Sequence, residues 1–380
     1  MAIYDFKNIE TKYDKFHIVS AIVKINDKEL PNKKAPYEVS DVDVDLTCGF
    51  EASMASFSIY NVYNEPKAQF ETTDIQKYIY LGSKVEVFLG YRDTVQSVFV
   101  GLIAKVSYQY LDGEIPCIRV TAMDPKSIMM AGSYHKQLKA KTHTDAVKEI
   151  LQKTTYNKLQ STGIISGIEV TAPMSIPTVG GAKASAETIE MVAESDYEFI
   201  VKLAKKYNYE FFCDNGKVYY RKAKAVTTPI FTLSPSMGVQ SFDIEYDITG
   251  LSETILARST DAAKGSLIEA KTKFTNKISM GNKAKNMIKG SQHVYVDPTI
   301  SSDEDAKNRV ESLLEDISFR FGTLNLDMVG IPEMKPGYFL DLQCFGDGPS
   351  NVFYIMNVRH IIRGDGGYTM HITGKSNSML

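Results

Sequence analysis

The sequence predicts a mainly β protein with an α+β insert, in which two related antiparallel β-barrel domains flank a helix-plus-hairpin domain. Three observations predict this arrangement. Apolar and polar residues alternate along short segments in the first and last thirds of the chain, as they do in half-buried strands. A capped helix followed by an aromatic hairpin lies between them, within residues 184–222. The two β regions also repeat one order of strands and turns.

Composition limits the class of protein. With 380 residues the chain is long enough for two or three domains, and its 43% apolar residues can supply sizeable cores. The net charge of −3 gives no electrostatic basis for specific nucleic-acid binding. No apolar run reaches the ~18 residues that a membrane span needs, and the first residues lack the apolar core of a signal peptide. We therefore expect a protein without a membrane segment that is made and folded in a cytoplasm.

The first β region predicts a barrel domain over residues 1–130. Turn residues such as Asp112-Gly113 separate its strand-like segments. The expected strands are 19–25, 42–46, 55–59, 84–89, 97–108 and 118–122. About six short strands with this punctuation are typical of a closed or nearly closed barrel.

The middle region, residues 131–227, predicts the α+β domain. Ser195 and Glu198 form a capping box at a helix start, and Asn208 suits the left-handed residue that ends a helix. The apolar period then changes from 3.6 to 2, and the turn at 214–216, Asp-Asn-Gly, predicts a hairpin.

Two other segments complete this domain. Residues 144–151 begin with Thr144-Asp145 and carry one apolar face, which predicts a helix. Residues 154–183 are rich in Thr, Ser, Gly and Pro, which predicts a connector with a single strand at 168–170.

The third region, residues 228–380, returns to a β pattern and predicts the second barrel. Its expected strands are 239–246, 251–258, 324–328, 338–342, 352–358 and 368–373. Ser302 with Asp305 starts a helix at about 302–319, whose apolar stripe is expected to pack on its own barrel. Residues 261–290 form a lysine-rich excursion, in which seven lysines accompany only two acidic residues.

The two β regions can be aligned with each other. Residues 81–87 match residues 336–342, an offset of 255 that places Gly82 on Gly337. The same offset places Phe99, Val100 and Ile103 on Tyr354, Ile355 and Val358. After a small gap in the following hairpin, Asp112-Gly113 pairs with Asp365-Gly366, and Ile118 and Val120 pair with Met370 and Ile372. This run of agreements predicts an internal duplication.

Residues 194–211, ESDYEFIVKLAKKYNYEF, followed by a short hairpin and placed between two β-rich halves, carry a family resemblance. They resemble the middle of the tail hub family of contractile phages. That family includes the late control protein D type and the hub half of the valine-glycine-repeat spike proteins of type VI secretion. The resemblance covers nearly the whole chain and implies two related barrels. The sequence departs from the secretion spikes because it ends at Leu380, so we expect the spike to be a separate chain.

The resemblance implies a structural baseplate hub of a contractile phage tail, tail-like bacteriocin or injection particle. Such a hub is a homotrimer that adapts a six-fold tail tube to a three-fold central spike. The implied partners are the spike, the tail tube or tube initiator protein, the tape measure protein and the baseplate wedge proteins. The implied location is the cytoplasm during assembly and then the virion tail or particle baseplate.

Catalytic and metal sites lack sequence support. The six histidines show no HExxH or paired-ligand spacing, and no GxSxG, Walker or GxGxxG motif occurs. The four cysteines, Cys48, Cys117, Cys213 and Cys344, are far apart and all fall in strand-like segments, so we expect scattered buried thiols. We therefore expect no enzymatic activity, no metal and no cofactor.

The lysine-rich excursion has two interpretations. One is a basic segment that faces an acidic partner or passing DNA, for which the candidate residues are Lys271, Lys273, Lys277 and Lys283. The other is a solvated hairpin tip, which is the usual meaning of a run of charges.

Two alternatives to the contractile hub stay open. The first is the hub, or tail-associated tip protein, of a non-contractile phage tail, whose family shares the barrels. The second is a peripheral receptor- or carbohydrate-binding tail protein, to which the aromatic hairpin at residues 209–220 could contribute stacking surfaces. The internal repeat favours a hub over the peripheral protein.

Overall fold

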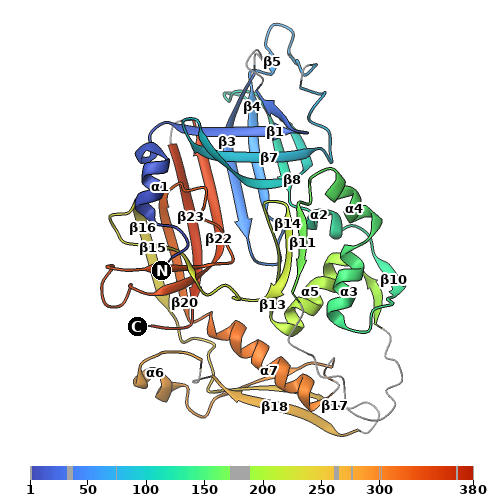
Figure 1. The fold of residues 1–380 in the computed structure, drawn as a ribbon, viewed down its shortest axis with the longest axis vertical. Helices are drawn as coiled ribbons and strands as arrows, with labels where there is room; N and C mark the ends of the chain where they lie inside the picture. Colours follow the sequence, from blue (N-terminus) through green and yellow to red (C-terminus); the bar gives the residue numbers. More distant parts are fainter. Residues whose placement is uncertain are drawn as a thin grey trace.

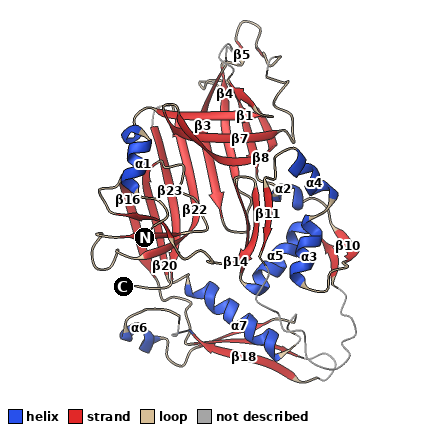
Figure 2. Ribbon diagram, viewed as in Figure 1, coloured by secondary structure: helices blue, strands red, loops and turns tan. Residues whose placement is uncertain are grey.

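The computed structural model describes residues 2–31, 37–73, 75–171, 189–260, 265–274, 277–298, 300, 302–364 and 367–379. Across these residues the chain is mainly β, and thirteen strands form one large, largely antiparallel sheet. In Figure 1 a group of helices and short strands lies beside the large sheet, and a small sheet with a long helix lies below the large sheet. Figure 2 shows that most of the helices belong to the two smaller bodies. The predicted mainly β fold is confirmed.

The large sheet takes strands from both ends of the sequence. Its strand order is β16-β20-β23-β22-β3-β4-β9-β8-β7-β1-β2. In addition, β21 pairs with β22, and β15 pairs with β21. Its strands are β1 (Val19–Ile25), β2 (Lys28–Leu30), β3 (Glu38–Thr47), β4 (Met54–Tyr60), β7 (Lys84–Tyr91), β8 (Thr94–Gln109), β9 (Cys117–Met123), β15 (Pro229–Leu233), β16 (Val239–Tyr246), β20 (Gly322–Val329), β21 (Phe339–Leu342), β22 (Val352–Arg363) and β23 (Gly367–Ser376).

The other elements are short, apart from two helices. The remaining strands are β5 (Tyr63–Asn64), β6 (Gln69–Phe70), β10 (Tyr134–Gln137), β11 (Gly167–Val170), β12 (Glu190–Glu194), β13 (Tyr209–Asp214), β14 (Lys217–Lys222), β17 (Thr254–Thr260), β18 (Leu267–Lys273) and β19 (Gln292–Val296). The helices are α1 (Phe6–Lys12), the 3-10 turn η1 (Asp14–Phe16), α2 (Lys126–Met129), α3 (His143–Leu151), α4 (Thr154–Ser161), α5 (Asp196–Tyr207), α6 (Asn282–Met287) and α7 (Asp303–Ser318).

The large sheet contains a repeated unit. The order β3-β4-β9-β8-β7 in the first half is the order β16-β20-β23-β22-β21 in the second half. In each half three antiparallel strands follow a glycine with a φ of +85°, Gly82 in one and Gly337 in the other. The halves differ outside this unit, since β1 runs antiparallel to β7 whereas β15 runs parallel to β21. The shared strand order agrees with the predicted duplication.

The backbone hydrogen bonds correct the predicted alignment. The Gly82 amide donates to Ile103 at 2.8 Å, and the Gly337 amide donates to Ile355 at 3.0 Å. Register shifts also follow Ile103 in β8 and Ile355 in β22. Ile103 is therefore equivalent to Ile355, an offset of 252 rather than 255. The gap therefore falls between the first two strands of the repeat, within residues 87–99 as compared with 342–351, and not in the later hairpin. The turn residues 365 and 366 lie outside the described residues.

The two halves meet edge to edge and share one core. Residues Asn357–Ile362 of β22 pair antiparallel with Thr47–Val42 of β3, which makes one continuous sheet. A single hydrophobic core takes residues from both halves, including Val44, Val87, Leu326 and Ile372. Within the described residues no pairing joins the two ends of the sheet path. Closure into two barrels is therefore not seen, because β22 extends beyond β21 and continues the sheet into the first half. The predicted boundaries near residues 130 and 227 stay predictions.

The middle of the chain forms the predicted helix and hairpin around its own core. Ser195 and Glu198 make the capping box of α5, and Asn208 ends it with a φ of +53°. β13 and β14 pair as an antiparallel hairpin, and β11 adds to β14 in parallel. The predicted strand at residues 168–170 is thus present, but α4 occupies part of the expected connector. The rest of that connector, residues 172–183, lies outside the described residues.

A third core was not anticipated from the sequence. The order β18-β17-β19 forms a small sheet that α7 covers, and the core includes Ile255, Ile268 and Leu314. We call these elements, residues 247–321, the lysine-rich subdomain. It is inserted between β16 and β20, where the first half has only the turn from β3 to β4. The predicted helix at 302–319 is confirmed as α7, capped by Ser302, and it packs on this small sheet rather than on the large one.

Candidate functional site: the junctions of the two halves and the insert

Three polar sites of the described chain lie at junctions between its parts. Among the described residues, no group of three or more His, Cys, Asp or Glu side chains is arranged to hold a metal ion. None of the helices found there is long and apolar enough to cross a membrane. The expected absence of enzymatic activity stays an expectation.

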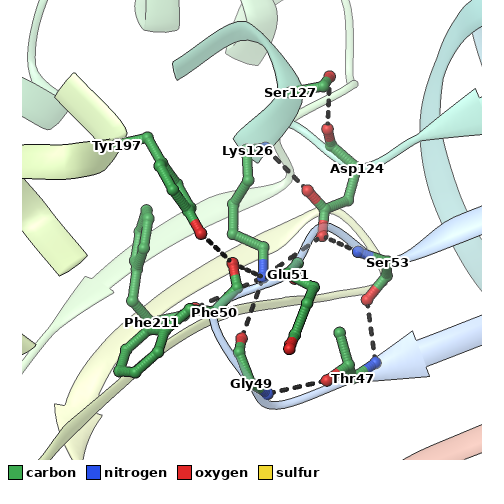
Figure 3. Close-up of polar contacts among 10 residues, drawn as sticks. All are labelled: Thr47, Gly49, Phe50, Glu51, Ser53, Asp124, Lys126, Ser127, Tyr197 and Phe211. Carbon is green, nitrogen blue, oxygen red and sulfur yellow. Dashed lines mark hydrogen bonds and ion pairs between the residues drawn. The ribbon is translucent and has the colours of Figure 1, made fainter. Parts of the chain in front are cut away.

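Lys126 lies at the centre of the first junction (Figure 3). It begins α2, with two residues between it and the end of β9, and its side chain is fully buried. Its ammonium group donates to the carbonyl oxygens of Gly49 at 3.3 Å, Phe50 at 3.5 Å and Phe211 at 3.5 Å, and also to that of Glu51. The turn between β3 and β4 is thereby bound to the hairpin of the insert. A charged amine tolerates such burial because several acceptors surround it.

Asp124 completes this site. Its carboxylate accepts hydrogen bonds from the amides of Ser53 and Lys126, both at 2.8 Å, and lies 3.9 Å from the Lys126 ammonium. Burial raises the pKa of Asp124, and the nearby ammonium and backbone donors oppose that rise. Tyr197 of α5 donates its hydroxyl to the Phe50 carbonyl at 2.9 Å. The turn is therefore held from two sides, by its own sheet and by the insert.

The second junction joins the insert to the second half. Arg221 of β14 pairs with Glu210 of β13 at 3.1 Å, and both side chains are 8% exposed. The same guanidinium donates to the Gly337 carbonyl at 2.7 Å, and Tyr354 of β22 donates its hydroxyl to Glu210. Burial raises the pKa of Tyr354 well above its usual value. An ion pair that is this buried needs the further hydrogen bonds to offset its desolvation. The insert is thus fixed to both halves of the sheet.

The third junction is a cleft of about 680 Å³ between α5 and the lysine-rich subdomain. Arg309 of α7 pairs with Asp297 at 2.9 Å and donates to the Lys205 carbonyl of α5 at 2.8 Å. At the other side His143 lies 2.6 Å from the Tyr207 hydroxyl. Burial, together with nearby lysines, lowers the pKa of His143 to about 4. The cleft residue His143 is therefore neutral at pH 7.

The four predicted lysines do not form one tip. Lys271 and Lys273 are exposed on β18, and Lys283 is exposed on α6. Lys277 follows β18 and pairs with Glu315 of α7 at 3.3 Å. The segment is part of a folded subdomain, so the expected hairpin tip is wrong for these residues. The β17–β18 turn itself, residues 261–264, lies outside the described residues.

Sequence reasoning missed the junction residues. The pairing of Glu210 with Arg221 had a usable signal, because the turn at residues 214–217 sets a register that places them opposite each other. Lys126 had none, since a lysine after a strand is usually exposed. One of the expected buried thiols is also wrong: Cys344 is exposed in a loop with a φ of +64°, while Cys48, Cys117 and Cys213 are buried.

The fold is similar to solved structures of tail proteins. The 43 kDa tail protein of prophage MuSo2 from Shewanella oneidensis has a TM-score of 0.65 and 14% identity, over 94% of this chain and 98% of that one. A tail protein from Neisseria meningitidis MC58 has a TM-score of 0.62 and 14% identity, over 95% and 97% of the two chains. At these identities the likeness shows a shared fold.

A secretion-system protein has the same fold. It is an Escherichia coli component of the type VI secretion system, described as structurally similar to the T4 bacteriophage tail proteins gp27 and gp5. Its TM-score is 0.55 at 11% identity, over 93% of this chain and 76% of that one. The fold predicted from the family resemblance is thus shared with phage tail and secretion proteins.

Comparison of sequences gave two results. No curated protein matches this chain. A family described as the Alg8 N-terminal domain matches residues 15–364, which is most of the chain. The chain therefore belongs to the Alg8 N-terminal domain family.

Proposed function

We propose that this chain is the structural hub of a contractile tail or tail-like injection particle. Three copies form a ring that joins a six-fold tail tube to a three-fold central spike. The proposed partners are the spike, the tube or tube initiator, the tape measure protein and the wedge proteins. The proposed location is the particle baseplate, after assembly in the cytoplasm. The role requires no reaction, and we propose that the chain has no enzymatic activity, no cofactor and no specific affinity for nucleic acid.

One observation carries this proposal: two similar units follow each other edge to edge in one chain. The strand order β3-β4-β9-β8-β7 recurs as β16-β20-β23-β22-β21, and β22 joins β3. Three such chains in a closed ring present six similar units. This is what an adaptor between six-fold and three-fold partners requires. The shared fold with tail proteins supports the same role.

The two inserted parts give the ring a direction. The insert binds the turn between β3 and β4 through Lys126. The lysine-rich subdomain replaces the equivalent connection between β16 and β20. Both parts therefore leave the sheet at the same end. We propose that this end faces the spike or the periphery and that the opposite end faces the tube.

A reconstruction of the assembled particle tests the proposal. We expect three copies whose six repeat units lie at one height along the axis, with the insert present three times outside that layer. Two repeat units at different heights would overturn the adaptor role. The mass of the purified chain, measured by light scattering with and without the spike, is expected to shift toward a trimer. A monomer under both conditions would also contradict the proposal.

Gene content separates the contractile hub from the hub of a non-contractile tail. A sheath gene among the neighbouring reading frames is expected for the contractile particle, and its absence favours the non-contractile one. A glycan-binding assay tests the peripheral carbohydrate-binding protein, for which we expect no binding.

A further inference from the structure

The junction between the halves shows how one repeat unit receives the next. Residues 357–362 of β22 have β23 on one edge and β3 on the other. Three positions of this junction, His360 on β22 with Val42 and Val44 on β3, are at most 2% exposed. These positions lie where β22 is paired on both edges, by β23 and by β3 of the other half. The junction is therefore a template for the contact between successive units.

The same strand in the first half has no such neighbour in the described chain. Residues 94–102 of β8 pair with β7, and residues 102–109 pair with β9. Among the described residues, the outer edge of residues 105–109, the counterpart of residues 357–361, therefore has no strand paired with it. At the far end of the sheet path β16, the counterpart of β3, pairs with β20 and with no other described strand. The first unit thus ends in the unpaired edge of β8, and the second unit ends in the unpaired edge of β16.

We propose that the outer edge of β8 in one copy pairs antiparallel with the outer edge of β16 in a second copy of this chain. This inference rests on the proposed ring and names its contact. The offset of 252 between β8 and β22 and the offset of 200 between β3 and β16 transfer the register of the internal junction. The resulting partners are Lys105 with Asp247, Val106 with Tyr246, Ser107 with Glu245, Tyr108 with Ile244, Gln109 with Asp243, and Tyr110 with Phe242.

The apolar row of this register explains side chains that are otherwise exposed. Tyr108 is 49% exposed, Tyr110 is 61% exposed and Phe242 is 43% exposed. Their counterparts at the internal junction lie against the next unit. Each edge is also supported from its own side, since Phe70 packs on Tyr108 and Phe345 on Phe242. Pairing of the two edges would place Tyr110 beside Phe242 and extend the core face of the sheet across the contact.

The polar row is complementary in charge. At the internal junction Arg359 pairs with Asp43 at 2.5 Å. In the proposed contact Lys105 lies opposite Asp247, and the β16 edge also carries Asp243 and Glu245. The acidic edge of one copy therefore meets a basic residue of the next. Opposite charges placed across strands favour that pairing over the pairing of two identical β16 edges, which would bring like charges together.

Cysteine cross-linking tests the register. The variant Ser107→Cys with Glu245→Cys places thiols at directly opposed positions, in a Cys344→Ser background because Cys344 is the exposed native thiol. Cross-strand partners lie about 4.5–5.5 Å apart at Cβ, which is close to disulfide range. Ser107→Cys with Ser241→Cys is the matched control, since its second thiol lies four residues, or roughly 13 Å, farther along β16. We expect linked dimers and trimers from the first variant and none from the control.

Each outcome bears on the contact. Samples that are trimeric by light scattering but give no linked species, or that link equally in the control, overturn the edge pairing and leave the hub role standing. Chains that stay monomeric with the tail partners present overturn both the edge pairing and the hub role.

As a second variant, Phe242→Asp is expected to lose the trimer while keeping its circular dichroism spectrum. Met287→Asp, at a position 75% exposed on α6, is the control and should keep the trimer. A trimer that survives Phe242→Asp contradicts the edge pairing.

Discussion

At the residue scale, the stability of the insert depends on a few buried charges. Lys126 is fully buried among the carbonyl groups of a turn and of β13. Glu210 and Arg221 are also buried, between the insert and the second half. Buried charges of this kind add little net stability when complete, but loss of one partner leaves the rest unsatisfied.

Replacing Lys126 with methionine should be strongly destabilising. The substitution keeps an unbranched side chain only one atom shorter but leaves four carbonyl groups and the Asp124 carboxylate without their cation. We expect a loss of about 3–5 kcal/mol in the free energy of unfolding, measured by urea denaturation. Lys283→Met, at an exposed position on α6, is the control and should change it by less than about 0.5 kcal/mol. If Lys126→Met loses no more free energy of unfolding than Lys283→Met, the hydrogen bonds of Lys126 do not contribute to folding stability.

His360 should make the protein less stable in acid. Burial lowers its pKa to about 4 in the folded chain, below the value of 6.5 expected when unfolded. Between these values the unfolded chain binds more protons than the folded chain, so stability is full above pH 6.5 and falls as the pH drops toward 4. The shift corresponds to about 3 kcal/mol.

Urea denaturation at several pH values checks this prediction. The variant His360→Gln should lose less stability than the native chain across the same window, because it cannot take up that proton. His143, whose pKa is also lowered to about 4, titrates in both proteins and cancels in the comparison. Parallel curves for the two proteins would contradict the prediction.

At the element scale, the two glycines that open the repeated strands are a matched pair. Both have a φ of +85°, so alanine is strained at either position. A Cβ at Gly82 would meet nothing within 4 Å, whereas at Gly337 it would lie 2.9 Å from Nη2 of Arg221. That guanidinium is held by Glu210 and cannot easily move.

We expect Gly82→Ala to cost about 1–2 kcal/mol from backbone strain alone. Gly337→Ala should cost at least about 1 kcal/mol more, because it also displaces the buried arginine. Thermal and urea denaturation of the two variants check the difference. Similar losses would mean that Arg221 can shift without weakening the junction.

At the scale of the whole molecule, the lysine-rich subdomain behaves as an insertion. It has its own core, and its two ends lie together because the Asp247 amide donates to the Phe321 carbonyl at 2.9 Å. We expect that replacing residues 249–320 with a short Gly-Ser linker leaves the large sheet folded. Circular dichroism and the protease resistance of the remaining chain measure this. A chain that unfolds would show that the small sheet is needed by the large one.

The four lysines of this subdomain allow a test of partner contact. Their change to glutamine should alter the free energy of unfolding by less than about 1 kcal/mol, since only Lys277 has an ion pair among the described contacts and that pair is exposed. If the segment faces a partner, assembly of particles should fall at unchanged stability. Unchanged assembly would assign the lysines to solvated surface. Gln substitution of exposed Lys139, Lys141, Lys158 and Lys222 in the insert is a charge-matched control.

The sequence by itself determined the elements whose signals are local. The capping box at Ser195, the left-handed Asn208 and the hairpin after it depend on hydrogen bonds between residues a few positions apart, and all were predictable. The start of α7 at Ser302 is of the same kind. The repeated strand order was also readable, because alternation and turn glycines recur in the same order in both halves.

Only the tertiary structure decided which edges and faces meet. β22 pairs with β3, which lies more than 300 residues away in the sequence. Neither sequence identifies the other strand as its partner, because any two edge strands with the same apolar–polar alternation can pair. α4 has a polar sequence, and it is tied into the fold by the hydrogen bond from Tyr156 to Asp196, at 2.6 Å, which no local pattern reveals. The local sequence predicts that Lys126 is exposed, and only the packing of the insert against this residue buries it. Local patterns fix the strands and helices, whereas burial and pairing depend on segments that are distant in sequence and that only the folded chain brings together.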